Sequence, residues 1–537
     1  MYTRRDILKS FLGLPVALAA CKTSSPAGAM DGRIIGASNE VGHLLRERRK
    51  FEVGPGNWEQ TDTVIVGGGI AGLSAAWKLR REGFSDFVLL ELEERAGGTS
   101  ASGRSELTAY PWGAHYLPVP FAENKELVDL LDEMRLIESK DESGELIIPE
   151  QYLTRDPEER IFHKGRWYEG LYLYAGATEE DLRQLNAFQK ELEKWITWRD
   201  AEGRRAFTVP VSACSRDSEV TSLDKISFAE WLANKGFRSE RLIWYCDYAC
   251  RDDYGLTLSQ TSAWAGLFYF CSRVTEAGEE SQSFITFPEG NGRFVDHFAS
   301  RSEANLRGSS MVAEIIPGDK GAEVVYIDTK TRSAKGIRAK RVIYSAPVFT
   351  AGYLIRGFSE AAPFDPREFK HNAWFVANLH LKERPRNRFE RDFPLSWDNV
   401  IYESPSLGYV TATHQKGIDY GPTVLTYYYP MADEDLRAGM QKLLSLDWNE
   451  LSDICLTDLE RAHDNIRDAT ERIDIMRWGH AMISPRTGFL FGGEREKAMK
   501  PFRNVHFAHS DLSGIAIFEE AFHHGLRAAS EVLGRST

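Results

Sequence analysis

The chain has 537 residues, of which 42% are hydrophobic and 27% charged, with a formal net charge of −13 at pH 7. This length and composition can bury the cores of two domains, which excludes general disorder. The acidic excess is poorly suited to nucleic acid, whose phosphates attract clusters of Lys and Arg, so we expect no nucleic-acid partner.

Residues 1–21 are typical of an export signal. Arg4 and Arg5 precede an apolar stretch, residues 11–20, that is too short to cross a bilayer. Leu18-Ala19-Ala20-Cys21 resembles the lipobox of bacterial lipoproteins, in which the cysteine is lipidated; the alternative is a plain signal peptide with an accidental cysteine. The resemblance implies export by the twin-arginine machinery, a lipid anchor at Cys21 and a location on the periplasmic side of a bacterial membrane. Residues 22–60 predict a linker.

The next segment predicts a dinucleotide-binding unit. Residues 61–66 indicate a buried strand, residues 73–82 a helix and residues 87–90 a second strand that ends at Glu91. Between the first strand and the helix lies Gly67-Gly68-Gly69-Ile70-Ala71-Gly72. Gly67 permits the tight turn, Gly69 lets backbone approach a pyrophosphate, and Gly72 allows close packing of helix on strand. The helix start at Ile70 and Ala71 offers N–H groups to phosphates, and Glu91 can bind an unphosphorylated ribose. This unit alone does not show whether the dinucleotide is FAD or NAD.

The residues after Glu91 narrow the choice. Arg95-Ala96-Gly97-Gly98-Thr99 and then Trp112-Gly113-Ala114-His115-Tyr116 resemble two consecutive loops of the flavin-containing amine oxidase and phytoene desaturase superfamily. In that family the paired glycine brings backbone against the pyrophosphate, an arginine usually follows it, and the second loop lies near the flavin ring. Because Thr99 stands where the arginine is usual, we expect Arg95 or Arg104 to meet the phosphate instead.

Later segments match the same family in the same order. Residues 287–294 lead into a helix, residues 311–316 indicate a strand, Ala346-Pro347 ends another, and residues 505–533 form a closing strand and helix. The resemblance implies that Val312 meets the adenine, that Asp511 holds the ribityl or pyrophosphate region, and that the helix beginning near Ile517 faces the flavin. It therefore implies FAD. No cysteine follows Cys455, which argues against a cysteine-linked flavin, so we expect noncovalent FAD.

These segments predict the organisation of the chain as an α/β protein. An FAD-binding Rossmann-like domain, split over residues 61–117, 285–350 and 479–537, is interleaved with an α+β substrate domain of residues 118–284 and 351–478. The first insert predicts helices at 123–136, 179–195, 228–235 and 241–250, and the second predicts strands at 374–381 and 423–429 with a helix near 434–444. The remaining cysteines show no zinc-ligand spacing, so we expect no metal site and interpret them as core residues.

The family resemblance also predicts the chemistry. Flavin oxidoreductases accept a hydride at N5 of the ring from a substrate carbon. The aromatic-rich inserts suit a small organic substrate, although aromatic runs are more often plain core. His480, within an Arg-Trp segment similar to that of the family, and His509 are candidates for polar groups near the ring; the alternative is that both are hydrogen-bonded structural histidines.

Two departures from the family weaken the hypothesis of amine oxidation. Typical amine oxidases carry a lysine in a strand of the second insert, whereas residues 375–378 contain none, and Ile517 stands where they have a tyrosine. Oxidation of an amine, including a polyamine drawn by the acidic body, stays the first hypothesis. The second is a desaturase or isomerase of a hydrophobic substrate, and the third is a lipid-anchored binding protein that keeps FAD only as a structural group.

Overall fold

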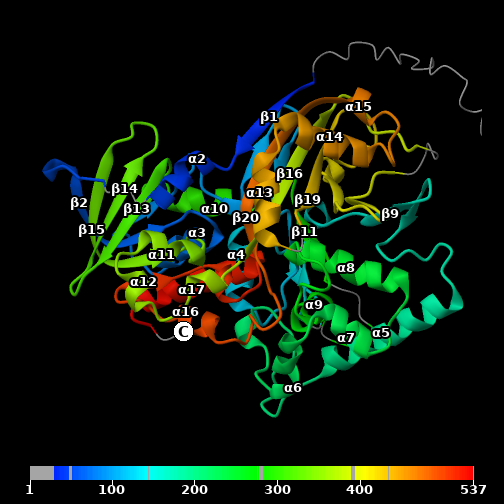
Figure 1. Cartoon of the computed structure of the whole chain (residues 1–537), viewed down its shortest axis with the longest axis horizontal. Coiled ribbons are helices and arrows are strands. Elements are labelled where there is room, and N and C mark those ends of the chain that lie inside the picture. Colours follow the sequence, from blue (N-terminus) through cyan, green and yellow to red (C-terminus); the bar gives the residue numbers. More distant parts are fainter. Residues whose placement is uncertain are drawn as a thin grey trace, which may run out of the picture.

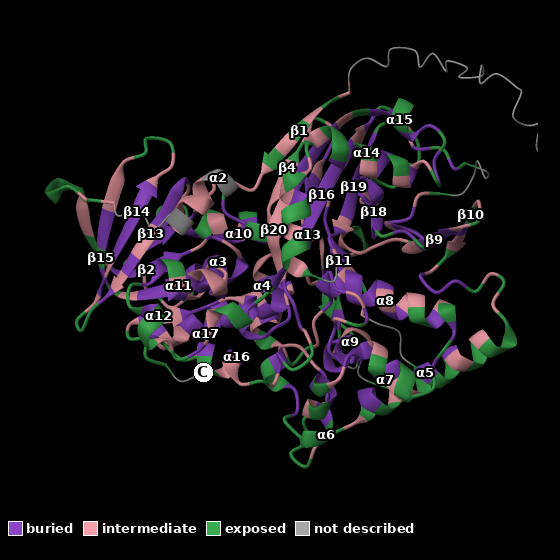
Figure 2. Cartoon of the chain, in the orientation of Figure 1, coloured by how far each residue is buried: buried purple, intermediate pink, exposed green. Residues whose placement is uncertain are grey.

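The computed structural model describes residues 30–47, 51–142, 144–274, 276, 278, 282–388, 394–432 and 435–535. The twin-arginine segment and Cys21 lie outside these residues. Figure 1 shows two sheet-centred lobes, with a group of helices beneath the larger sheet. Figure 2 shows that the buried residues gather on the central strands of both sheets and on the helix faces against them. The α/β architecture predicted from the sequence is confirmed.

The smaller sheet builds the predicted dinucleotide-binding lobe. Its strand order is β12-β3-β2-β15-β14-β13, and β21 also pairs with β15. The strands are β2 (Trp58–Val66), β3 (Phe87–Leu90), β12 (Leu306–Arg307), β13 (Ser310–Pro317), β14 (Ala322–Asp328), β15 (Ala334–Tyr344) and β21 (Val505–Phe507). β12, β3, β2, β15 and β21 pair in parallel, while β13 and β14 extend the sheet by antiparallel pairing. The carboxyl ends of the parallel strands therefore meet at one edge, where such sheets bind ligands.

Three helices pack in this lobe: α3 (Ile70–Arg81), α10 (Gly292–Ser302) and α17 (Phe518–Val532). The ring of Trp77 on α3 lies 5.9 Å from the ring of Phe298 on α10 and 5.7 Å from that of Phe522 on α17. All three aromatic side chains are buried. The closing helix of the chain is thus packed against the helix that follows the first glycine turn, as the split domain requires.

The larger sheet belongs to the substrate lobe and has the order β1-β20-β16-β19-β18-β17-β9-β10. Its strands are β1 (Asp31–Gly36), β9 (Glu159–His163), β10 (Arg166–Glu169), β16 (His371–Leu381), β17 (Asp398–Ile401), β18 (Gly408–Thr411), β19 (Thr423–Pro430) and β20 (Thr470–Ile483). β16 is buried on both faces along almost its whole length, including the polar side chains of Asn372 and Asn378, which are hydrogen-bonded. It pairs antiparallel with both β19 and β20 and forms the centre of this lobe.

The helices predicted for the two inserts are confirmed, with shifted ends. The first insert holds α4 (Lys125–Glu133), α5 (Glu179–Thr197), α6 (Ser218–Thr221), α7 (Phe228–Asn234), α8 (Glu240–Tyr254) and α9 (Ala263–Cys271). The rest of the chain adds α2 (Asn39–Gly42), α11 (Ala351–Leu354), α12 (Phe358–Ala361), α13 (Leu436–Ser445), α14 (Trp448–Leu459), α15 (Ile466–Ala469) and α16 (Glu494–Ala498). Capping boxes that begin at Thr178 and Ser227 fix the starts of α5 and α7.

Two predicted boundaries are wrong. Residues 22–60 are not a linker throughout, because β1 pairs in parallel with β20 at the edge of the larger sheet and β2 already begins at Trp58. The edge position leaves β1 half exposed, so its sequence carries too few apolar residues to indicate a strand. The boundary at residue 479 cuts through β20, which continues to Ile483 because its pairing with β16 continues.

The remaining cysteines of the described chain, Cys214, Cys246, Cys250, Cys271 and Cys455, are free and buried, so their interpretation as core residues is confirmed. Within the described ranges, no helix has both the length and the apolar character needed to cross a membrane. The same ranges contain no group of three or more His, Cys, Asp or Glu arranged to hold a metal ion.

Candidate active site

The predicted phosphate-binding turn joins β2 to α3. Gly67 has φ +102°, and a Cβ on Gly72 would lie 1.9 Å from the Gly67 carbonyl oxygen, so both positions require glycine. At Gly69, by contrast, a Cβ would meet nothing within 4 Å, so this backbone borders open space. Gly69 is also the N-cap of α3 and offers no side-chain cap to the N–H groups that begin at Ile70 and Ala71. The turn therefore fits the close approach of a phosphate to backbone and helix N-terminus.

The second glycine turn lies directly against the first. The Gly97 N–H donates to the Gly68 carbonyl at 2.8 Å, and Gly98 has φ +55°. The Ala114 N–H in turn donates to the Thr99 carbonyl at 2.9 Å. The segments 67–72, 97–99 and 113–114 thus form one continuous strip of backbone. This glycine strip runs from the start of α3 to the Gly113 loop. Ala346 lies beside this strip, because its N atom is 3.1 Å from a Cβ placed on Gly67.

Glu91 lies at the end of β3, as predicted for a ribose-binding acid. Its carboxylate accepts N–H bonds from Gly68 at 2.6 Å and Glu93 at 2.8 Å. Burial raises its pKa to about 7 against the opposing effect of these N–H groups. The strand that holds Val312 starts beside it, since the Ser310 N–H donates to the Glu91 carbonyl at 2.7 Å. The residues predicted for adenine and ribose therefore lie together.

Neither arginine proposed for the phosphate is buried. Arg95 and Arg104 are both exposed, and both act electrostatically on Asp296 of α10, which is exposed as well. Arg95 and Arg104 therefore stay the two predicted candidates for the phosphate contact.

A cavity of about 150 Å³ lies between this strip and the larger sheet. Thr99, Gly113, Ala114, His115 and Ile517 of the predicted set all line it. The larger sheet contributes aromatic and apolar side chains to the lining, and the closing helix contributes its first turn. These residues are Trp374 and Val376 on β16, Val410 on β18, Tyr428 on β19, Trp478 and Met482 on β20, and Phe518 on α17.

Two hydrogen bonds tie the Gly113 loop to the sheet. The Tyr428 hydroxyl donates to the Gly113 carbonyl at 2.8 Å, and the Trp478 indole N–H donates to the Trp112 carbonyl at 2.7 Å. His115 packs against the Tyr428 ring with a centroid distance of 4.8 Å, and burial lowers its pKa to about 4, which leaves the imidazole neutral at pH 7. These contacts hold the Gly113 loop against the larger sheet, with a neutral imidazole packed beside it.

Another part of the cavity lining is acidic, which was not predicted from the sequence. The cavity is lined by four carboxyl groups, Asp252, Asp253, Asp398 and Glu519, and by one cation, Arg273. The missed signal was the Arg-Asp-Asp-Tyr run at residues 251–254, because the helix was expected to end at Cys250, whereas α8 continues to Tyr254.

The charges of this lining do not balance. Arg273 lies 3.6 Å from Glu519. Burial raises the pKa of Asp252 to about 7 and that of Asp253 to about 6, and Arg273 partly offsets both effects. Asp398 has no such compensation, because burial and the nearby carboxyls of Glu159 and Asp252 all raise its pKa. Its Oδ1 accepts the Asn399 N–H at 2.8 Å and its Oδ2 lies 3.4 Å from the Tyr248 hydroxyl. The cavity is thus short of positive charge.

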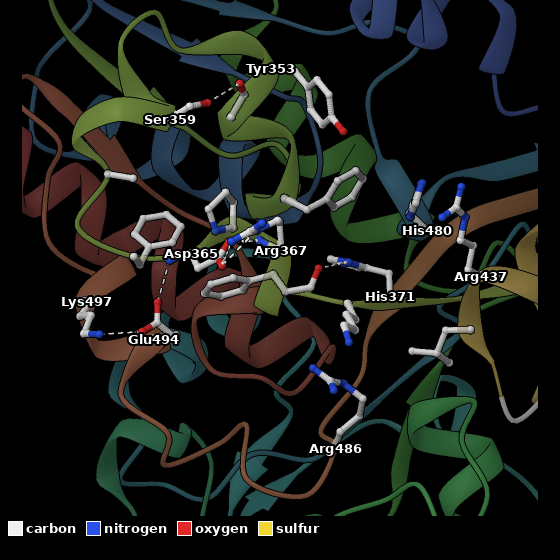
Figure 3. Close-up of a pocket in the computed structure, with 18 of the residues that line it drawn as sticks. Tyr353, Ser359, Asp365, Arg367, His371, Arg437, His480, Arg486, Glu494 and Lys497 are labelled. Atoms are coloured by element: carbon white, nitrogen blue, oxygen red, sulfur yellow. Dashed lines mark hydrogen bonds and ion pairs between the residues drawn. The ribbon is translucent and has the colours of Figure 1, made fainter.

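The two candidate catalytic histidines lie away from this cavity. His480 lines a separate, open groove of about 1310 Å³ between the lobes, together with His371 and Arg486 (Figure 3). Trp478, Ala481 and Met482 line the aromatic cavity while His480 does not; the pairing of β20 with β16 is irregular between Trp478 and Met482, so simple strand alternation does not hold there. His509 lies beside Asp511, with its Nδ1 3.0 Å from Oδ1 of that carboxylate. Both positions fit the structural alternative better than acid or base work in the cavity.

The two sequence departures are visible in the cavity wall. Val376 lies on the stretch of β16 where a lysine was sought, and Asn378 uses its amide to donate to the Pro111 carbonyl at 3.0 Å. No lysine is among the described residues that line the cavity. Ile517, the N-cap of α17, lines the wall where a tyrosine was expected.

The fold and the paired glycine turns define a flavin-dependent oxidoreductase of the two-lobed type. The family of flavin-containing amine oxidoreductases matches residues 70–533, and the chain belongs to it. Its members carry a flavin, and the glycine strip, the uncapped helix start and Glu91 fit that cofactor.

Among known proteins, the chain is 20% identical over 292 residues to the oxidoreductase PigB of Serratia sp. (strain ATCC 39006). The match covers 52% of the chain and 41% of that relative, so less than half of the relative's length is spanned. Similar solved structures include a putrescine oxidase bound to putrescine, with 17% identity, a TM-score of 0.65 and coverage of 89% of this chain and all of that one. A cyclohexylamine oxidase from Brevibacterium oxydans IH-35A has 14% identity, a TM-score of 0.62 and coverage of 89% and 99%. A fatty acid isomerase from P. acnes has 16% identity, a TM-score of 0.63 and coverage of 88% and 98%. These similarities concern the fold.

Proposed function

We propose that this oxidoreductase oxidises a small organic amine with noncovalently bound FAD. The observation that carries the proposal is the excess of carboxyl groups over cations in the lining of an otherwise aromatic cavity. A buried carboxylate without a cation is costly, and a protonated amine supplies the missing charge. A neutral hydrophobic substrate would leave those carboxyl groups uncompensated.

The residues that hold FAD are those of the glycine strip. Gly69, Gly98 and the N-terminus of α3 meet the pyrophosphate, Glu91 meets the ribose, and the Gly113 loop with Ile517 borders the ring. FAD, when bound, supplies the acceptor for a hydride equivalent from a substrate carbon. Noncovalent binding is supported by the buried, hydrogen-bonded or packed state of the free cysteines.

The cavity residues bind and orient the amine. Asp398 and Asp252 attract its ammonium group, while Trp374, Tyr428 and Trp478 contact its carbon skeleton and exclude water. Oxidation requires the neutral amine, so one proton must leave the ammonium group before the hydride does. Asp252, whose pKa burial raises to about 7, is matched to take that proton near neutral pH.

A direct test compares amines with neutral analogues of the same shape. The FAD-loaded protein is mixed with primary amines, diamines and the corresponding alcohols and hydrocarbons, and both bleaching of the flavin absorbance and release of peroxide are recorded. We expect bleaching with at least one amine and none with its neutral analogue. Bleaching by neutral apolar compounds alone would contradict the proposal.

A desaturase or isomerase of a hydrophobic substrate is the second candidate. It is favoured by Val376 and Ile517, which make the wall more apolar at the two positions where amine oxidases carry lysine and tyrosine. A desaturase would bleach the flavin with a hydrocarbon of the panel. An isomerase would convert its lipid-like substrate without net release of peroxide. A purely structural FAD would give no bleaching with any donor.

We further propose that the protein is exported folded by the twin-arginine machinery and anchored on the periplasmic side of the membrane through a lipid at Cys21. The proposal is supported by the sequence of residues 1–21 alone. Fractionation of cells that produce the intact chain or its Cys21→Ser variant tests it. We expect only the intact chain in the membrane fraction, and equal distribution of both would refute the anchor.

A further inference from the structure

Two smaller hollows lie between the aromatic cavity and the surface. A neck of about 20 Å³ shares Arg273 and Glu519 with the lining of the aromatic cavity. A surface pocket of about 380 Å³ in turn shares Asn124 and Glu519 with the neck. This pocket also includes Glu126 and Arg535, whose side chains are 44% and 56% exposed, so it reaches solvent. Among the described lining residues, Glu519 alone borders all three spaces.

An ion pair stands at the border between the neck and the aromatic cavity. Glu519 lies in the first turn of α17, and Arg273 follows the end of α9. An Nη atom of Arg273 lies 3.6 Å from Oε1 of Glu519, which is longer than a hydrogen bond. The Nε of Arg273 is buried without a hydrogen-bond partner, and Asp253 on the cavity side also attracts the guanidinium. The pair can therefore separate without the loss of a hydrogen bond between its two members.

The size of the neck means that a substrate cannot pass unless side chains move. A volume of about 20 Å³ holds about one water molecule. The large groove that contains His480 offers more room, about 1310 Å³, but it has no lining residue in common with the aromatic cavity among the described residues. The neck and the surface pocket are thus the hollows that adjoin the cavity.

The charges along this route favour a cation. Glu126 lies in the surface pocket, Glu519 in the neck, and Asp252 and Asp253 in the cavity. When Arg273 moves towards Asp253, an ammonium group can take its place beside Glu519 and keep that buried carboxylate compensated. A neutral molecule of the same size would leave Glu519 buried without a cation while it passed, which costs free energy.

We propose that Arg273 and Glu519 form a gate through which the substrate enters the aromatic cavity from the surface pocket, and that Glu519 makes this entry selective for cations. The inference rests on the proposed function, in which the substrate is a protonated amine. It assigns Glu519 a part in the rate of entry and leaves the oxidation step to the flavin and the residues around it.

The test blocks each route with a bulky maleimide on an introduced thiol. Asn124→Cys places the thiol between the surface pocket and the neck, where the Asn side chain makes no capping hydrogen bond, and Ser530→Cys places it elsewhere in the same pocket. Ser359→Cys is the matched control, because the exposed Ser359 lines the large groove. The Cys21→Ser chain serves as parent, since the other cysteines are buried. Each variant is compared with its own unlabelled form, with FAD content and Tm recorded.

Two rates are measured on the FAD-loaded protein by stopped flow. The first is flavin bleaching by the preferred amine, at limiting and at saturating concentration. The second is the association of benzyltrimethylammonium, followed by the fluorescence of Trp374 and Trp478 in the cavity lining. The second rate needs no oxidation, so it reports entry even where no amine is turned over.

We expect the label at Asn124→Cys or Ser530→Cys to slow association and bleaching at limiting amine by at least about 10-fold, with bleaching at saturation within about 2-fold, because affinity and entry change while chemistry does not. Glu519→Gln should slow association of the cation by about 10-fold and make it less dependent on salt, as the loss of an attracting charge predicts. The label at Ser359→Cys should change neither rate.

Slowing by the label at Ser359→Cys alone, equal slowing at all three positions, or unchanged entry in the Asn124→Cys and Ser530→Cys forms would overturn the gate. A wild-type protein that binds benzyltrimethylammonium by the blocked route but oxidises no amine would refute the proposed function and leave the gate standing. A wild-type protein that neither binds this cation nor is bleached by any amine would overturn both.

Discussion

Replacement of Asp398 by Asn should change stability and activity in opposite directions. Burial and the carboxyls of Glu159 and Asp252 raise the pKa of Asp398, so the folded protein disfavours its charged form. With a folded pKa above the unfolded value, stability falls as pH rises from about 4 towards the folded pKa. The amide of Asn keeps an acceptor for the Asn399 N–H and removes the charge. We therefore expect Asp398→Asn to stabilise the FAD-loaded protein at pH 7, with an increase of a few degrees at most in Tm.

The same substitution should weaken amine oxidation. A hydrogen bond between a buried carboxylate and an ammonium group contributes about 1.5 to 3 kcal/mol, so kcat/KM for the preferred amine should fall by roughly 10-fold to 150-fold. The assays are thermal unfolding and initial rates on one preparation, with FAD content measured as the control. A variant that loses stability and keeps its kcat/KM would refute the assignment of Asp398 as the cation-binding residue.

Three further predictions follow from the site. Gly69→Val should abolish FAD binding with little change in the Tm of the apoprotein, because a side chain there enters open space, whereas Gly72→Ala should destabilise the fold through contact with the Gly67 carbonyl. Gel filtration, thermal unfolding and flavin titration separate the two effects. Equal behaviour of the two variants would contradict the assignment of the glycine strip as the phosphate site. The affinity for a permanently charged inhibitor, such as a benzyltrimethylammonium ion, should rise as pH increases through about 6 to 7, because Asp253 and Asp252 ionise over that range. Asp252→Asn should remove the upper part of this pH dependence. An affinity of the wild type that does not change with pH would argue against the acidic lining. Acid or heat denaturation should release all flavin into the supernatant, and flavin that stays with the precipitated chain would disprove noncovalent binding.

The dinucleotide-binding lobe could be predicted from sequence because its requirements are local. Gly67 and Gly72 are dictated by a turn and a helix–strand contact within a few residues, and the strands on either side are short apolar runs. The long helices α5 and α8 were likewise visible as apolar residues at helical spacing. Edge strand β1 was missed because a half-exposed strand pairs through its backbone, which leaves no apolar pattern.

The substrate cavity could not be predicted in this way, because it depends on contacts between distant segments. Asp398 begins a short strand of the second insert and Asp252 lies in the last turn of a helix of the first, and only folding brings them to one cavity. The place of His480 depends on a similar long-range feature: it lies in the groove, at a point where the pairing of β20 with β16 is irregular, and local spacing does not reveal such an irregularity. Ile517 and Gly113 were placed in the cavity because the family order of segments carries long-range information that local spacing lacks.

A crystal structure of the FAD-loaded protein with a bound, slowly oxidised amine tests the central claim most directly. The account predicts the pyrophosphate against Gly69 and Gly98, the flavin ring beside the Gly113 loop, and the amine nitrogen within hydrogen-bond distance of Asp398 or Asp252. A flavin bound outside the glycine strip, or an amine nitrogen that points away from both carboxyl groups, would contradict it.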